Sequence, residues 1–186
     1  MMRRGLLIVI VLLSGVFIFR EAILGKIGTF LLVDQPAGKV DIAVTGAITD
    51  KVARCYHRGD CKKIYVVVGD FRDTWKALRD FDMEGMVTRQ AQAANIKKID
   101  LVIIKPGLAV SASVKFNYFK KLFLKNNIKS AIFYHTYYHT RNYRFYLDRY
   151  LAGSGIVTFV QPVDDNYSFE RWWENTMLDN LLSEEY

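Results

Sequence analysis

Five short apolar runs, separated by segments long enough for helices, are the feature that most constrains the fold of this chain. They lie at residues 40–46, 63–69, 100–105, 129–134 and 156–160. None alternates cleanly between apolar and polar residues, and most are solid Val, Ile, Leu and Tyr. Continuous apolar strands are typical of a parallel sheet that helices cover on both faces. The pattern therefore predicts an α/β fold: a doubly wound, three-layer domain with a mainly parallel, five-stranded sheet.

The segments between the runs differ in how strongly they predict helices. Residues 83–95 and 111–125 have helical spacing, and in the second Phe116, Phe119 and Phe123 recur on one stripe. We expect this stripe in the core and the lysines of the same segment, Lys115 among them, on a solvated face. Residues 70–82 fit either an extra helix or an ordered loop. Residues 51–60 are too short and irregular to predict a crossover helix.

Residues 130–151 give the first indication of a site. The stretch begins as an apolar run, passes through a polar group that includes Thr136 and His139, and then takes up helical spacing. Four residues at i, i+3, i+4 and i+7 share one helix face: Tyr143, Tyr146, Leu147 and Tyr150. A strand followed at once by a helix, with polar groups at the junction, is where α/β proteins build ligand sites.

The N-terminus predicts a membrane anchor. Arg3 and Arg4 precede the uncharged segment 5–19, whose fifteen residues would span about 22 Å as a helix, against roughly 30 Å of hydrocarbon. The span becomes sufficient if the helix continues to Leu24 and Arg20 extends toward the interface. We expect a transmembrane signal-anchor at 1–24, a juxtamembrane linker at 25–39 and the domain at 40–186, outside the cytoplasm. A cleaved signal peptide and a buried hydrophobic helix are the alternatives.

Two cysteines and the net charge limit the other function classes. Cys55 and Cys61 are close enough in sequence for a small disulfide loop outside the cytoplasm, although two unrelated thiols remain the alternative. A zinc site with His57 is disfavoured because no second ligand pair follows, so we expect no metal and no cofactor. The formal charge of +7 favours anionic lipids or phosphate-bearing molecules, but no segment concentrates it with stacking aromatics, which argues against nucleic acid.

The carboxyl ends of the predicted strands supply the candidate site residues. In a parallel sheet these ends meet at one edge, where ligands bind. The residues placed there are Gly46, Gly69, Asp70, Ser111, Thr136, His139 and Arg141. His139 and Asp70 are candidate catalytic groups, and Arg141 is a candidate anion clamp. Ser111 and Asp70 could simply cap helices, the glycines could ease turns, and His135 is expected to be structural.

Residues 136–141 (TYYHTR) resemble the T-S-x-Y-H-T-R-R-A signature of the YdcF/SanA/ElyC-like family. The later Arg171-Trp172-Trp173 and the closing Glu184-Glu185-Tyr186 resemble that family's W-W and E-Y pattern, so that the likeness covers residues 40–186. The chain departs from the family at Asn142, where a second arginine is usual, and at the glycine-rich turns after the first two strands.

The resemblance implies a Rossmann-like domain that is tethered to the bacterial inner membrane and faces the periplasm. It also implies a part in cell-envelope or cell-wall biogenesis or in barrier function. From His139 and Arg141 we expect the domain to bind a small anionic or lipid-linked precursor at the carboxyl edge of the sheet. The sequence leaves two other functions open. One is a non-catalytic scaffold derived from an enzymatic ancestor, and the other is a nucleotide-type cofactor binder.

Overall fold

The computed structural model describes residues 19–68, 82–105 and 111–163 of the 186-residue chain. Residues 33–165 belong to one compact unit, which is the α/β domain, whereas the helix α2 belongs to a separate unit. The described elements, in chain order, are α2 (Arg20–Leu31), β1 (Val40–Thr45), α3 (Asp50–His57), β2 (Cys61–Val67), α4 (Met83–Ala93), η2 (Lys98–Asp100), β3 (Leu101–Ile104), α5 (Ala112–Lys125), β4 (Ser130–His135), η3 (Tyr137–His139), α6 (Thr140–Leu151) and β5 (Val157–Pro162).

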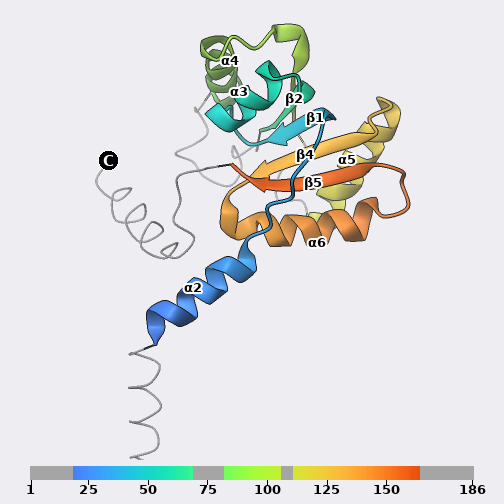
Figure 1. The fold of residues 1–186 in the computed structure, drawn as a ribbon. Coiled ribbons are helices and arrows are strands. Elements are labelled where there is room, and N and C mark those ends of the chain that lie inside the picture. Colours follow the sequence, from blue (N-terminus) through green and yellow to red (C-terminus); the bar gives the residue numbers. More distant parts are fainter. Residues whose placement is uncertain (1–18, 69–81, 106–110, 164–186) are drawn as a thin grey trace, which may run out of the picture. The chain divides into compact units, whose positions relative to one another are not determined.

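The five strands form one parallel sheet in the order β3-β2-β1-β4-β5 (Figure 1). The prediction of a five-stranded α/β sheet is therefore confirmed, and the topology is consistent with a Rossmann-like domain. β1 is the central strand, and its Ala43 lies level with Ile64 of β2 and Ile132 of β4. All three side chains are buried, as expected for strands that are covered on both faces.

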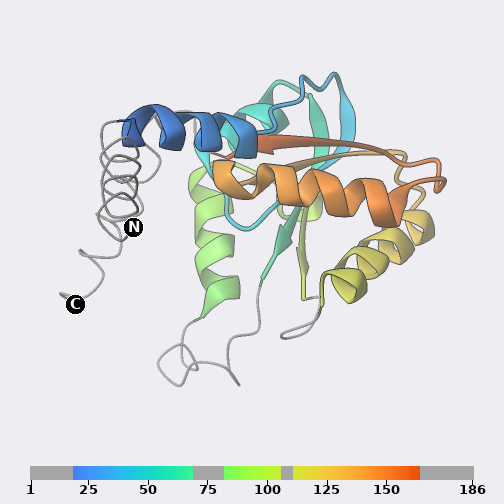
Figure 2. The same ribbon diagram turned by 90° about the horizontal axis from the view of Figure 1, so that it is seen from below.

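Helices cover the sheet in two layers: α3 and α4 lie on one face, and α5 and α6 on the other (Figures 1 and 2). Each face has its own apolar core. Val52, Ile64 and Val87 belong to the core beneath α3 and α4. Phe119 and Leu147 belong to the core beneath α5 and α6. Each strand presents apolar side chains to both helix layers. Its sequence is therefore a continuous hydrophobic run with no polar alternation.

An aromatic interface joins α5 to α6 and confirms the two helix faces read from the sequence. Phe116, Phe119 and Phe123 of α5 are almost completely buried. The Phe116 ring stacks on Tyr146 and Tyr150 of α6, with centroids 5.4 and 6.2 Å apart. Such aromatic pairs contribute about 1 kcal/mol each beyond their buried area, so this interface holds the two helices in a fixed relation.

Helix α3 fills the crossover that the sequence left undecided. Asp50 lies in its first turn, and Val52 and Cys55 point into the core. The helix ends because Gly59 takes a φ of +70°, a conformation that costs glycine little, and the chain then turns into β2. The sequence did not predict this helix because the segment is short and only two of its residues, Val52 and Cys55, are buried.

Helix α2 covers residues 20–31 and therefore includes seven residues that the sequence assigned to the linker. The helix ends where Leu32 becomes extended, a few residues before Pro36. Among the described residues, no helix has both the length and the apolar composition to cross a membrane. The predicted anchor at 1–24 falls mostly on residues outside the described part of the chain.

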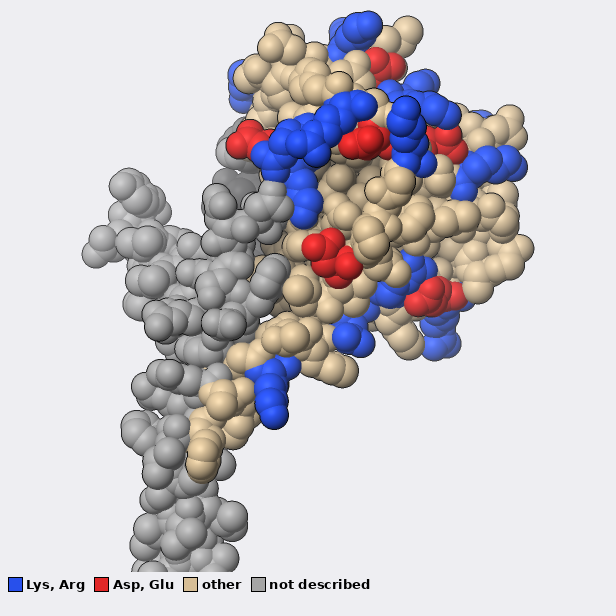
Figure 3. Space-filling model, viewed as in Figure 1, with Lys and Arg blue, Asp and Glu red and all other residues tan. Residues whose placement is uncertain are grey.

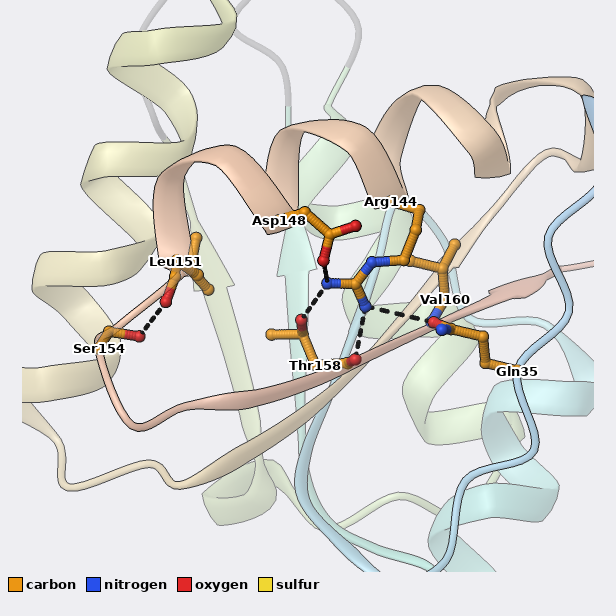
Figure 4. A network of polar contacts seen from close by, with 7 residues as sticks. All are labelled: Gln35, Arg144, Asp148, Leu151, Ser154, Thr158 and Val160. Carbon is orange, nitrogen blue, oxygen red and sulfur yellow. Dashed lines mark hydrogen bonds and ion pairs between the residues drawn. The ribbon is translucent and has the colours of Figure 1, made fainter.

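The extended segment 33–39 is fixed to the edge of the sheet (Figure 4). The Gln35 amide donates to the Val160 carbonyl at 3.0 Å, and the Gln35 side-chain oxygen accepts from the Val160 amide at 3.1 Å. Arg144 of α6 also donates to this side-chain oxygen and to the Thr158 carbonyl. The segment therefore covers part of the backbone that β5 would otherwise expose as an edge strand.

Candidate functional site

The strand order places a topological switch point between β1 and β4. β1 continues into α3 on one face of the sheet, and β4 continues into α6 on the other (Figure 1). In open α/β sheets, ligands bind beyond the carboxyl ends of the strands at such a point. Val44 of β1 pairs with Phe133 of β4, so Gly46 lies level with His135 two residues further on. A side chain on Gly46 would meet nothing within 4 Å, so the space next to this residue is open.

Four side chains from β4, η3, α5 and α6 meet beside this point. The His135 ring lies 4.1 Å from the Tyr143 ring and 5.3 Å from the His139 ring, measured between centroids. The Lys115 ammonium donates a hydrogen bond to the Tyr143 hydroxyl and lies 4.9 Å from the centre of that ring. His135, His139, Tyr143 and Lys115 are called the histidine cluster below. It joins two imidazoles, a phenol and an amine.

The surroundings keep the cluster's histidines uncharged near neutral pH. Burial lowers the pKa of His135 to about 4, the Lys115 charge adds to this effect, and a proton on His139 would add to it again. The part of the His139 ring that its neighbours cover is desolvated, which also lowers the pKa of His139, and Lys115 contributes again. Lys115 supplies positive charge while the neutral imidazoles can accept or donate a proton. The cluster can therefore attract an anion and exchange a proton with it.

His139 and His135 have different access to a ligand. The His139 side chain is exposed at the end of η3, where its ring also contacts the Tyr138 ring at 4.4 Å. His135 is partly buried, and its Nδ1 lies 3.1 Å from the Thr136 hydroxyl. His139 is consequently the group that can reach a bound molecule, and His135 packs behind it.

The predicted site residues are placed as follows. Thr136 and His139 lie in the turn between β4 and α6, and Arg141 is the second residue of α6 and is half-buried. Ser111 occupies the N-cap position of α5, one turn before Lys115, but its hydroxyl contacts Ser113 at 2.7 Å instead of capping the helix. Gly69 and Asp70 lie outside the described residues, as do Trp172 and Trp173.

Cys55 and Cys61 are both buried and present as free thiols. The two thiols interact with one another, and Cys55 also interacts with the Tyr134 hydroxyl. The pair is therefore adjacent in space, and its oxidation to a disulfide stays a prediction. His57 contacts the Ala94 carbonyl at 2.8 Å. Within the described part of the chain, no three His, Cys, Asp or Glu side chains come together as a metal site requires.

Sequence reasoning missed two members of the cluster and undervalued a third. Lys115 was expected on a solvated face, but it is half-buried against Tyr143. Tyr143 was correctly placed on the apolar face of α6, yet it stands at the end of that face nearest the site. His135 was expected to be structural, and its proximity to His139 became visible only in three dimensions. The one signal in the sequence was that Lys115 follows Ser111 by one helical turn.

No protein-family model matches this chain, and no curated protein matches it. The chemistry of the histidine cluster and its position at the switch point are consequently the basis for a functional interpretation.

Proposed function

We propose that the α/β domain binds a small anionic ligand, bearing phosphate or carboxylate groups, at the carboxyl edge of the sheet between β1 and β4. The observation that supports this most strongly is the meeting of two imidazoles with Tyr143, whose hydroxyl accepts a hydrogen bond from Lys115, at the switch point. Lys115 and Arg141 provide positive charge for the anion. His139 transfers a proton to or from the ligand, or donates a hydrogen bond to it.

His135 is a positioning residue in this proposal. It lies behind His139 and against Tyr143, so its ring fixes where the exposed imidazole can stand. Lys115 already places one positive charge near His139. Because His135 stays neutral, it adds no second charge that would lower the pKa of His139 further. The Tyr143 hydroxyl positions Lys115 in a similar way, because it accepts a hydrogen bond from the Lys115 ammonium.

On the strength of the sequence resemblance, we further propose that the chain is a membrane-anchored YdcF/SanA/ElyC-like protein of the bacterial envelope. Its ligand would then be a lipid-linked or other anionic precursor, met in the periplasm. A reporter enzyme fused after Tyr186 tests the topology. Activity of a reporter that works only in the periplasm supports the proposal, and activity of a cytoplasmic reporter contradicts it.

Ligand-induced thermal stabilisation tests the binding site itself. The probes are inorganic phosphate, a nucleoside diphosphate and a short-chain prenyl phosphate. Arg141→Gln is expected to weaken binding by about 2 kcal/mol, because a charge-assisted contact is lost. Arg149→Gln removes the same charge from the exposed far end of α6 and should leave the shift unchanged. Equal effects of the two variants would contradict the site.

A non-catalytic scaffold is the second candidate, and Asn142 favours it because the resembled signature carries an arginine there. The two candidates differ in what His139→Gln does. If His139 transfers a proton, the variant loses turnover of a bound substrate while its affinity changes little. If the domain only binds, the variant changes affinity alone.

A further inference from the structure

A cavity lies on the opposite face of β4 from the histidine cluster. Successive residues of a strand point to opposite faces, and Tyr134 belongs to the α3 side whereas His135 contacts α6. The cavity has a volume of about 420 Å³, within the roughly 300–1,000 Å³ that is usual for small-molecule sites. It is called the α3 cavity below. Its floor is formed by Ile132, Tyr134 and Gln161 of β4 and β5, and its walls by α3 and the extended segment at Ala37 and Gly38.

The wall that α3 contributes is strongly basic. Lys51, Arg54 and Arg58 all line the α3 cavity, and their spacing of three and four residues puts them on one side of the helix. Asp60 is the single carboxylate among the lining residues. Figure 3 shows the Lys and Arg side chains gathered over α3 on this face of the molecule. The surrounding domain adds to the field, since residues 33–163 hold 21 basic and 11 acidic side chains, a net charge of 21 − 11 = +10.

Helix stability explains only part of this arrangement. Arg54 lies in the last turn of α3 and Arg58 is its C-cap residue, where cations interact favourably with the helix dipole. Lys51 lies in the first turn, at the end where a cation is unfavourable. All three nevertheless line the same cavity. A ligand with several negative charges in this cavity would lie within reach of all three side chains.

We propose that the α3 cavity is a binding site for a small polyanion, whose phosphate or carboxylate groups are held by Lys51, Arg54 and Arg58. Arginine side chains bind both groups in bidentate fashion, which suits two arginines on one wall. Tyr134 and Gln161 on the floor complete the polar lining. The site is independent of the histidine cluster, because it lies on the other face of the sheet and shares no side chain with it.

Cys55 provides a local reporter for this cavity. Its side chain lines the α3 cavity and is 7% exposed, whereas Cys61 beneath it is 1% exposed. Hydrogen bonding from Cys61 lowers the pKa of the Cys55 thiol, and Tyr134 contributes in the same direction, although burial opposes them. The chain has only these two cysteines, so modification at Cys55 can be followed without interference from other thiols.

The protein is first reduced and freed of reductant, and the test then measures how fast methyl methanethiosulfonate modifies Cys55 in the intact folded protein, read by peptide mass spectrometry. The rate is compared with and without inorganic pyrophosphate or citrate, at constant ionic strength. We expect saturating ligand to slow modification about tenfold. Protection by pyrophosphate alone identifies a phosphate ligand, protection by citrate alone a carboxylate ligand, and protection by both a site for polyanions in general.

Charge-matched variants decide whether the protection is specific. Arg54→Gln and Arg58→Gln should lose it, and Lys63→Gln, an exposed residue of β2 outside the cavity lining, should keep it. If Arg54→Gln does not fold, the Arg58→Gln variant, at an exposed position, provides the test of specificity. The proposal is overturned if neither probe protects Cys55, or if all three variants behave alike, since protection would then be general charge screening.

Discussion

Two ionisable side chains show how position within the fold sets opposite electrostatic roles. Asp41 lies at the start of β1 and accepts from the Lys129 and Ser130 amides at 2.9 and 3.1 Å, and Lys62 pairs with it at 2.8 Å. These hydrogen bonds, led by that from Lys62, lower the pKa of Asp41 to about 2. The stability it contributes is present above its ordinary pKa of 3.8 and is lost as the pH falls toward 2. Asp41 thus holds β4 to β1 at the end of the sheet opposite the site.

His135 is expected to make the protein less stable in mild acid. Its pKa is lowered from 6.5 to about 4, mainly by burial, so the unfolded chain binds a proton in this range and the folded protein does not. The free energy of unfolding should therefore fall between pH 6.5 and 4, by about 2 kcal/mol after allowance for partial exposure. Denaturant unfolding of the wild type and of His135→Asn, measured across this range, checks the prediction.

The control for this prediction is Asp41→Asn, which alters a different pH window. It should change the slope only below about pH 4, where Asp41 titrates. An unchanged slope between pH 6.5 and 4 in His135→Asn would show that another group is responsible for the acid sensitivity.

At the level of elements, Arg144 connects three parts of the chain. It reaches from α6 to the Thr158 carbonyl of β5 at 2.6 Å, to the Thr158 hydroxyl at 3.0 Å and to the Gln35 side chain at 3.3 Å (Figure 4). Asp148, one turn later on α6, pairs with the same guanidinium. α6 is thereby fixed to β5 by polar contacts on one side and to α5 by stacked aromatic rings on the other.

Arg144→Met is expected to destabilise the domain by about 2 kcal/mol, because the Thr158 carbonyl and the Gln35 oxygen lose a charged donor in a partly buried place. Arg149→Met is the matched control on the same helix. Arg149 is exposed and contacts the Tyr150 ring at 5.9 Å, so its loss should cost about 0.5 kcal/mol or less. Chemical denaturation of both variants provides the comparison, and equal losses would contradict the role of the network.

At the scale of the whole molecule, the segment that leads into β1 is hydrogen-bonded to the carboxyl edge of the sheet, where the histidine cluster lies. The Val33 amide donates to the Thr140 hydroxyl at 2.7 Å, and Thr140 directly follows His139. Gln35 then binds the edge of β5. The segment before β1 is therefore an integral part of the α/β domain, and it begins beside the histidine cluster.

Gln35→Ala should loosen this entrance without unfolding the domain. Amide hydrogen exchange at Val160 should accelerate about tenfold or more, because its acceptor is the Gln35 side chain. Asp34→Ala, at an exposed neighbouring position, serves as the control and should leave these rates unchanged. Exchange resolved by residue, with the melting temperature measured alongside, makes the test. Equal exchange in both variants would mean that backbone contacts alone hold the segment.

Local patterns in the sequence account for the elements and for their buried faces. The run at 129–134 is a parallel strand because it is apolar on both sides, and Phe116, Phe119 and Phe123 are buried because they share a helical stripe. The polar junction that contains Thr136 and His139 also lies where the sequence placed it. These features depend on spacings of two to seven residues, which the sequence displays directly.

The convergence of distant residues depends on strand order and on helix packing, which no local spacing encodes. Lys115 reaches Tyr143, and through that ring the neighbourhood of His135, because α5 packs beside α6. The α3 cavity exists because α3 and the segment at Gly38 form two walls above the same face of β4 and β5. The sequence did not predict a helix at residues 51–60 because the segment is short, although Val52, Cys55 and Tyr56 have the i, i+3, i+4 spacing of one helix face. Tertiary contacts stabilise so short a helix.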